Sequence, residues 1–325
     1  MMRKIVSGSC PLTDVTVAAK IQTELDNKLP KIDHKHMVHT VRLLERSYAE
    51  LMPKRHEISS KKPLERIATL GIGGFSALDA AVFHKQLGQA DITILADINE
   101  DQVSLFKEMK ESIATAADFN EFIDKYSQLQ VEKAATSRVF LKAGYVTQQF
   151  CEIKSEDEKA KTYASIKQFV LEAYTFDSAI HLCWKPENFE RLKEVFLSSV
   201  IIQLDLSDPD SAKHVGDALK RHDVTLSGGM YLSNVPYFLR PGDQDFAALK
   251  QAGKLLELKG SIQHLCQHGE PLIMTAIDDQ VSGTWPTAFW SVSELLKRID
   301  TYIEDEAGSK KFNSFFESIN PLPKR

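Results

Sequence analysis

The spacing of apolar residues predicts alternating strands and helices through much of the chain. Two short apolar runs, RIATLGI at 66–72 and DITILAD at 91–97, are bounded by glycine or charged residues, which is typical of buried strands. Between them, SALDAAVFHKQL at 76–87 has the composition and spacing of a helix. Because a strand, a helix and a second strand in so short a stretch need a right-handed crossover, the pattern predicts a parallel sheet.

The same alternation returns in the second half of the chain. Its predicted strands are VIIQLDL (200–206), VTLSGGMYLSN (224–234) and PLIMTAI (271–277). Its predicted helices are DSAKHVGDALKRH (210–222), DFAALKQAGKLLELKG (245–260) and SVSELLKRIDTYIEDE (291–306). We therefore predict an α/β fold with a doubly wound, mostly parallel sheet.

The region between these two parts, residues 100–196, has a mostly helical and charged pattern. Helices are predicted at DQVSLFKEMKESIATA (101–116), DFNEFIDKY (118–126) and EDEKAKTYASIKQFVLEA (156–173). No segment there has a strong strand pattern, so we predict a large helical insertion after the second strand.

The first sixty residues also have a helical pattern. Apolar residues recur near helical spacing from Asp14 to about Met52, with a break at Pro30, which predicts two helices. We therefore divide the chain into an N-terminal helical cap at 1–60 and an α/β domain at 61–325 that contains the insertion. The cap and the insertion are expected to form the lid and the acceptor pocket.

Composition narrows the class of protein. The 325 residues are 43% hydrophobic and 26% charged, as expected of a soluble globular chain with a large core. No apolar run approaches the roughly 18 residues needed to span a bilayer, and the first residues lack the apolar region of a signal peptide. We expect no membrane span and a cytoplasmic location, with export as an effector left open. A net charge of −5 without a long basic block argues against a nucleic-acid partner.

The cysteines and histidines predict no metal site. The four cysteines are scattered, with no C-x-x-C pair that would indicate a structural zinc site or a disulfide framework. The histidines of HKHMVH at 34–39 do not share one helical face, and QHLCQH at 263–268 has the same defect. We interpret both segments as solvated parts of helices.

Candidate chemistry gathers at the predicted strand ends, where ligands of doubly wound sheets bind. Three glycines, Gly71, Gly73 and Gly74, lie at the end of the first strand and in the turn after it, and they allow a ligand to approach the backbone closely. Asp97 closes the second strand, where a carboxylate can accept hydrogen bonds from a ribose diol, and Asp205 closes the third, where it can meet an adenine amino group. The set predicts an adenosine site, although glycines also occur where a strand packs tightly on its helix.

The turn fits a dinucleotide poorly. The fingerprint G-x-G-x-x-G/A requires glycine or alanine at its third position and an acid about twenty residues on, whereas Ser76 occupies the third position and Asp97 lies further along. The turn has no basic residue and no G-x-x-x-x-G-K-[ST] motif, which disfavours a triphosphate. S-adenosylmethionine, which carries no phosphate, is the alternative.

The motifs LGIGG, ILAD and LDLSD resemble class I S-adenosylmethionine-dependent methyltransferases. More narrowly, ADINEDQVSLFKEMK is similar to the D-x-N-x-x-Q stretch of a branch that includes the aminocarboxypropyl-transferring half of betaine-lipid synthases, and YLSN at 231–234 matches its fourth strand end. The resemblance covers about residues 65–280 and implies a Rossmann-like methyltransferase fold. It implies cofactor binding by Gly71, Gly73, Gly74, Asp97, Ile98, Asp205, Tyr231 and Ser233.

Within the D-x-N-x-x-Q stretch, Asn99 and Gln102 have simpler interpretations as well. Asn99 can cap the following helix, and Gln102 can face solvent. In many methyltransferases an acid stands where this chain has Thr69, and a third alternating glycine stands where it has Phe75. Another group would then contact the methionine amine.

The segment SNVPYF at 233–238 is the best candidate for catalysis. It is similar to the [D/N/S]-P-P-[Y/F] segment with which amine methyltransferases orient a nitrogen lone pair, with Val235 in place of the first proline. The resemblance implies catalytic roles for Asn234 and Tyr237. A rigid strand exit with a core tyrosine explains the segment equally well.

Three functions follow from these patterns. The first is transfer of a methyl group, or less readily an aminocarboxypropyl group, from S-adenosylmethionine to a small-molecule acceptor. The second is a catalytically silent protein of the same fold that engages a protein partner through its helical insertion. The third is a nicotinamide-dependent oxidoreductase.

Overall fold

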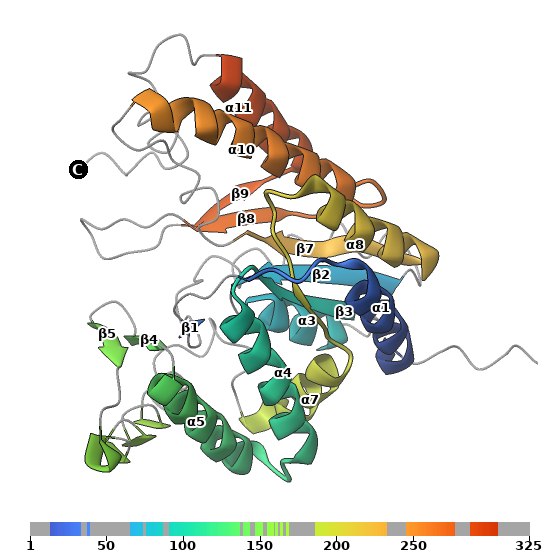
Figure 1. Ribbon diagram of the computed structural model, residues 1–325. Coiled ribbons are helices and arrows are strands. Elements are labelled where there is room, and N and C mark those ends of the chain that lie inside the picture. The colour runs from blue at the N-terminus through green and yellow to red at the C-terminus, as the bar shows by residue number, and fades with distance from the viewer. Residues whose placement is uncertain are drawn as a thin grey trace, which may run out of the picture.

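The computed structural model has an α/β architecture in which helices pack on both faces of a six-stranded sheet (Figure 1). It describes residues 14–33, 38–39, 66–73, 76–86, 91–136, 139–143, 147–151, 186–232, 245–276 and 287–304, with short pieces between 155 and 168.

The strands of the main sheet are β2 (Arg66–Ile72), β3 (Asp91–Asp97), β6 (Val200–Gln203), β7 (Val224–Tyr231), β8 (Ile273–Ala276) and β9 (Thr287–Trp290). Their order is β6-β3-β2-β7-β8-β9, and all pairs are parallel except β8 with β9. The chain adds strands on one side of β2 and then on the other, so the strand order reverses between β2 and β7. The predicted doubly wound, mostly parallel sheet is confirmed at this level, and this reversal is where such sheets bind ligands.

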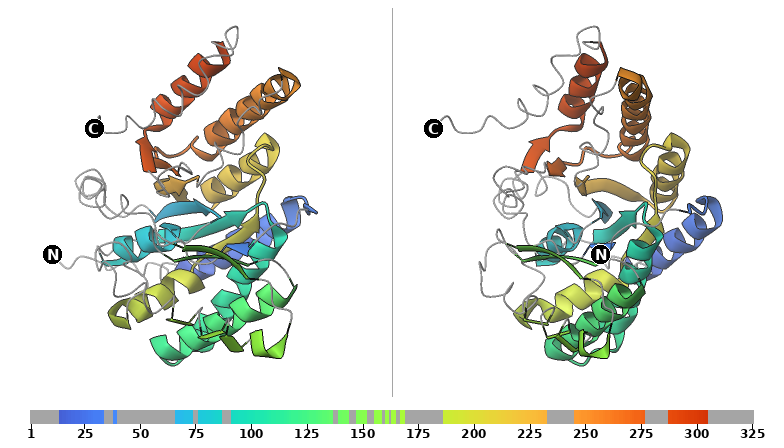
Figure 2. Two further views of the ribbon diagram at one scale, coloured as in Figure 1. Left: turned by 90° about the vertical axis from the view of Figure 1, so that its left-hand side faces the viewer. Right: turned by 60° about the vertical axis from the view of Figure 1, so that its left-hand side comes forward.

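The two faces of the sheet bury different helices because successive side chains of a strand point to opposite sides. Leu95 belongs to a buried hydrophobic cluster that is formed with residues of α3 (Ser76–Gln86), α4 (Glu100–Thr115), α5 (Phe119–Thr136) and α7 (Phe189–Leu197). The short 3-10 helix η1 (Pro186–Asn188) precedes α7. Ile94 belongs to a second buried hydrophobic cluster, which is formed with residues of α1 (Asp14–Lys28), α8 (Pro209–Arg221), α10 (Asp245–Leu265) and α11 (Val292–Glu304). Figure 2 shows α10 and α11 at one end of the molecule and α4 and α5 at the other, with the strands between them.

A second, three-stranded sheet corrects the prediction that the mostly helical insertion has no strong strand. β4 (Val139–Ala143) pairs antiparallel with β5 (Thr147–Cys151) and parallel with β1 (Val38–His39). Residues 38–39 were predicted as helix, and 139–151 fall in a region predicted to lack strands, so both predictions were wrong. The strands are short, and β1 joins them from about a hundred positions earlier, so local periodicity carries no signal for them.

The first helix belongs to the layer that covers the sheet. Val17, Ala18, Ile21 and Leu25 of α1 are buried against β6 and α8, and the helix ends at Lys28, just before the predicted break at Pro30. The Gln22 side chain donates to the Ile201 carbonyl at 2.9 Å and accepts from the Ile201 amide at 2.7 Å. This amide pairs with the outer edge of β6, which a sheet otherwise leaves exposed.

Candidate functional site

The glycine turn after β2 lies against the carboxylate that closes β3. Gly73 has a φ of +67°, a conformation that favours glycine, and a Cβ built on it would lie 3.1 Å from Asp97 Oδ2. The Gly73 amide donates to the Ala96 carbonyl at 2.9 Å. The turn therefore bends over the tip of β3, and the structure brings together the two residues on which the predicted site depends.

The start of α4 holds the Asp97 side chain in place. It is buried at 9% exposure, and its Oδ1 accepts a hydrogen bond from the Asn99 amide at 2.8 Å. Asn99 is the N-cap of α4, and its side-chain oxygen accepts from the Asp101 amide at 3.2 Å. One carboxylate oxygen is thus tied to the backbone, while the other faces the glycine turn.

Gln102, in the first turn of α4, is fully buried, so the interpretation that it faces solvent was wrong. The capping interpretation of Asn99 is confirmed.

Asp205 lies two residues beyond β6 at the same edge of the sheet. Its Oδ1 accepts from both the amide and the hydroxyl of Ser207, each at 2.7 Å, so the side chain shapes the turn into α8. Asp208 caps that helix by accepting from the Asp210 amide at 3.1 Å. The predicted contact of Asp205 with an adenine stays a prediction.

β7 reaches the same edge of the sheet. Tyr231, the last residue of β7, pairs with Gly71 in the sheet and is 2% exposed. Ile98 is half-buried and follows Asp97 directly. The remaining predicted site residues, Gly74, Ser233, Asn234 and Tyr237, lie outside the described residues.

A scan against protein-family models and a search of curated proteins both find no match for this chain.

Two further properties bear on the site. None of the helices that the structure describes is long and apolar enough to cross a membrane. Among the same residues, no group of three or more His, Cys, Asp or Glu side chains is arranged to hold a metal ion.

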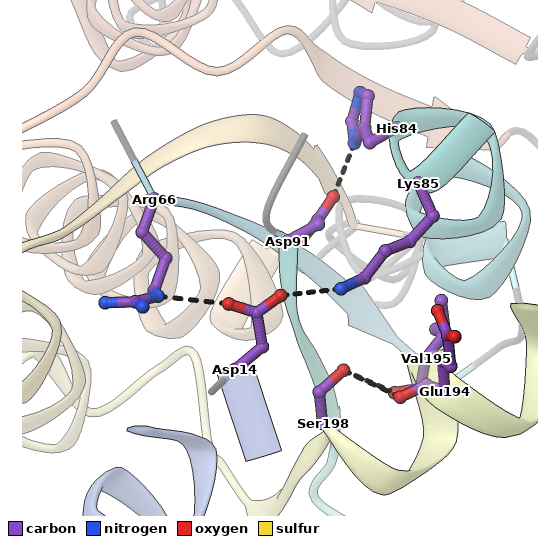
Figure 3. Close-up of polar contacts among 8 residues, drawn as sticks. All are labelled: Asp14, Arg66, His84, Lys85, Asp91, Glu194, Val195 and Ser198. Atoms are coloured by element: carbon purple, nitrogen blue, oxygen red, sulfur yellow. Dashed lines mark hydrogen bonds and ion pairs between the residues drawn. The ribbon is translucent and has the colours of Figure 1, made fainter. Parts of the chain in front are cut away.

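A buried polar cluster that sequence patterns did not predict lies towards the opposite, amino end of the strands (Figure 3). Asp91, the first residue of β3, accepts from the Thr69 hydroxyl at 2.8 Å and contacts the His84 ring on α3 through the same oxygen. All three side chains are less than 5% exposed. In the sequence, this cluster is indicated only by the presence of these polar residues in segments that are otherwise mostly apolar.

This cluster does not have the arrangement of a nucleophilic triad. In a triad the histidine lies between the nucleophile and the acid, whereas Asp91 here lies between Thr69 and His84. The cluster instead joins α3 to β2 and β3. Thr69 also faces this layer, so it does not contribute to the edge where Gly73 and Asp97 meet.

A neighbouring ion-pair cluster supports the same end of the sheet. Asp14 at the start of α1 contacts Arg66 Nε at 3.2 Å and Lys85 Nζ at 2.6 Å (Figure 3). The three side chains connect α1, the start of β2 and the end of α3. Their arrangement is structural, and the strand carboxyl ends remain the candidate binding site.

Proposed function

We propose that this chain binds S-adenosylmethionine at the carboxyl ends of β2, β3 and β6 and transfers its methyl group to a small-molecule acceptor. The strand order and its reversal beside Gly71 support a Rossmann-like methyltransferase fold. The resemblance of LGIGG, ILAD and LDLSD to class I methyltransferases supports the same assignment.

The approach of the Asp97 carboxylate to Gly73 is the observation that carries the proposal. A glycine turn binds phosphate through free amides, but the Gly73 amide already donates to Ala96, and Oδ2 of Asp97 lies 3.1 Å from the Cβ position. A phosphate at this point would meet a carboxylate of like charge. A ribose diol instead offers the hydroxyl donors that a carboxylate accepts, which favours a nucleoside at this point. The preference for S-adenosylmethionine over NAD is supported by the poor fit of the turn to the dinucleotide fingerprint.

The chemistry needs few charged residues. Bound S-adenosylmethionine would supply a methyl group on its sulfonium. An electron pair of the acceptor would form the new bond to the methyl carbon, and the pair of the broken carbon–sulfur bond would stay on sulfur. The protein has to orient the acceptor, and an amine acceptor also has to lose a proton, which water can take. We assign the orientation of the acceptor to Asn234 and Tyr237, as the resemblance implies.

Equilibrium binding by calorimetry tests the proposal. We expect the wild-type chain to bind S-adenosylmethionine and S-adenosylhomocysteine more tightly than NAD, and Asp97→Asn to weaken this binding at least tenfold, as the loss of a charged hydrogen-bond acceptor predicts. Asp208→Asn is the matched control, because it removes a charge at the same edge while an asparagine still caps α8.

Each alternative function has its own outcome. Failure to bind any adenine nucleoside at millimolar concentration would favour the catalytically silent protein, which Thr69 supports because it faces α3 instead of supplying an acid to the site. Preferential binding of NAD would favour the oxidoreductase.

A further inference from the structure

Gln203 joins three separate segments beside Asp97. It is the last residue of β6 and the sheet partner of Asp97. Its Nε2 donates to the Ile98 carbonyl at 2.9 Å and to the Ile32 carbonyl at 2.6 Å, and its Oε1 accepts from the Ile32 amide at 3.2 Å. The half-buried Gln203 side chain therefore connects the N-terminal segment 29–33, which follows α1, with the turn that follows β3.

This turn determines how the Asp97 carboxylate is presented. Ile98 lies between Asp97 and Asn99, whose amide holds Asp97 Oδ1. On the other side, the Leu204 amide donates to the Asp97 carbonyl at 3.0 Å. Gln203 holds the carbonyl of the peptide group whose N–H, on Asn99, donates to Asp97 Oδ1. Its loss would therefore loosen the turn without removing any group that faces the glycines.

Gln22 of α1 provides an internal comparison, because its side chain pairs with the same strand, β6. Its side-chain amide also pairs with both backbone groups of one residue, Ile201, only two positions before Gln203. A glutamine amide has one donor group and one acceptor, which suits it to this pairing. Gln22 attaches α1 to the sheet edge, whereas Gln203 also reaches the turn at Ile98.

We propose that Gln203 is a positioning residue of the nucleoside site, which couples the segment 29–33 to the turn at Asp97. The inference rests on the proposed nucleoside site. Because coupling between two sites is reciprocal, nucleoside binding stabilises the docked N-terminal segment by the same factor by which docking strengthens nucleoside binding.

Two variants separate this role from a purely structural one. Gln203→Met and Gln22→Met each remove a two-point amide contact with the backbone at a similar side-chain length, so we expect similar decreases in the urea midpoint. We expect Gln203→Met to raise the Kd for S-adenosylmethionine about tenfold, and Gln22→Met to change it less than twofold.

Hydrogen exchange at the Ile32 amide provides a measurement on the wild-type chain. Saturating S-adenosylmethionine should slow this exchange in the wild type and in Gln22→Met, but not in Gln203→Met. Equal Kd values for the two variants, or wild-type exchange at Ile32 that does not respond to S-adenosylmethionine, would overturn the positioning role alone. Failure of the wild-type chain to bind S-adenosylmethionine at all would overturn the proposed function and this inference with it.

Discussion

Replacing Gly73 with alanine tests the geometry on which the proposed site depends. The substitution forces a side chain into a φ of +67°, which costs about 1 kcal/mol relative to glycine. The new Cβ would also lie 3.1 Å from Asp97 Oδ2, closer than an ordinary contact, so the carboxylate would have to move by a few tenths of an ångström. We expect Gly73→Ala to lower the free energy of unfolding by about 1 to 2 kcal/mol and to weaken nucleoside binding.

Making the same substitution in the Asp97→Ala variant separates the free-energy cost of the backbone conformation from that of the contact with Asp97. In Asp97→Ala the contacting oxygen is absent, so Gly73→Ala should then cost only the backbone part, about 1 kcal/mol. The difference between the two backgrounds measures the coupling of the turn with the carboxylate.

Urea unfolding followed by circular dichroism gives the four free energies, provided that the slope with urea stays constant. Gly73→Asn is a useful third variant, because asparagine tolerates positive φ while keeping the contact. A wild-type stability for Gly73→Ala, or the same cost in both backgrounds, would refute the reasoning.

Three further predictions concern stability, pH and reactivity. Asp91→Ala removes the acceptor shared by Thr69 and His84 and should lower the free energy of unfolding by about 3 kcal/mol, since it leaves a buried ring and hydroxyl without that partner; a change below about 1 kcal/mol in urea unfolding would contradict the structural role. Desolvation raises the pKa of Glu24, but hydrogen bonds from Arg221 and Lys28 outweigh it and lower the pKa to about 2. The stability from Glu24 is therefore complete above its ordinary pKa of 4.5 and is lost as the pH falls towards 2, so the urea midpoints of wild type and Glu24→Gln should differ at pH 7 and converge below pH 4.5; a difference that stays constant with pH would disprove this assignment. Burial raises the pKa of the Cys266 thiol to about 12, so iodoacetamide at pH 8 should label Cys266 in urea but not in the native protein, as peptide mass spectrometry would report; rapid native labelling would show that the thiol is accessible.

Local sequence patterns predicted the elements that surround the site. β2 and β3 have the bounds predicted from RIATLGI and DITILAD, because continuous apolar runs bounded by polar residues specify buried strands. Asp97 and the glycines were placed at strand ends by the same reasoning, since the carboxyl ends of adjacent parallel strands meet at one edge. The approach of the Asp97 carboxylate to Gly73 was therefore expected from the predicted topology.

Contacts between distant segments could not be predicted in this way. The pairing of β1 with β4, and of Gln203 with Ile32, joins residues more than a hundred positions apart. A glutamine at the end of an apolar run has no local feature that distinguishes a solvent-facing side chain from one that holds two backbone segments. The same is true of Thr69, Asp91 and His84, whose shared hydrogen bonds depend on how α3 packs across the sheet.

The sequence by itself determined the class of fold and the strands of the main sheet other than β9 (Thr287–Trp290), and it predicted the edge at which a ligand would bind. These properties depend on the periodicity and the breaks of the apolar pattern, which are local. The tertiary structure alone decided that Thr69 contacts Asp91 instead of facing the proposed site, and that Gln203 holds the turn after β3 to the segment 29–33. Each of these depends on the direction of a side chain relative to residues far away in the chain, and hydrophobic periodicity contains no information about that direction.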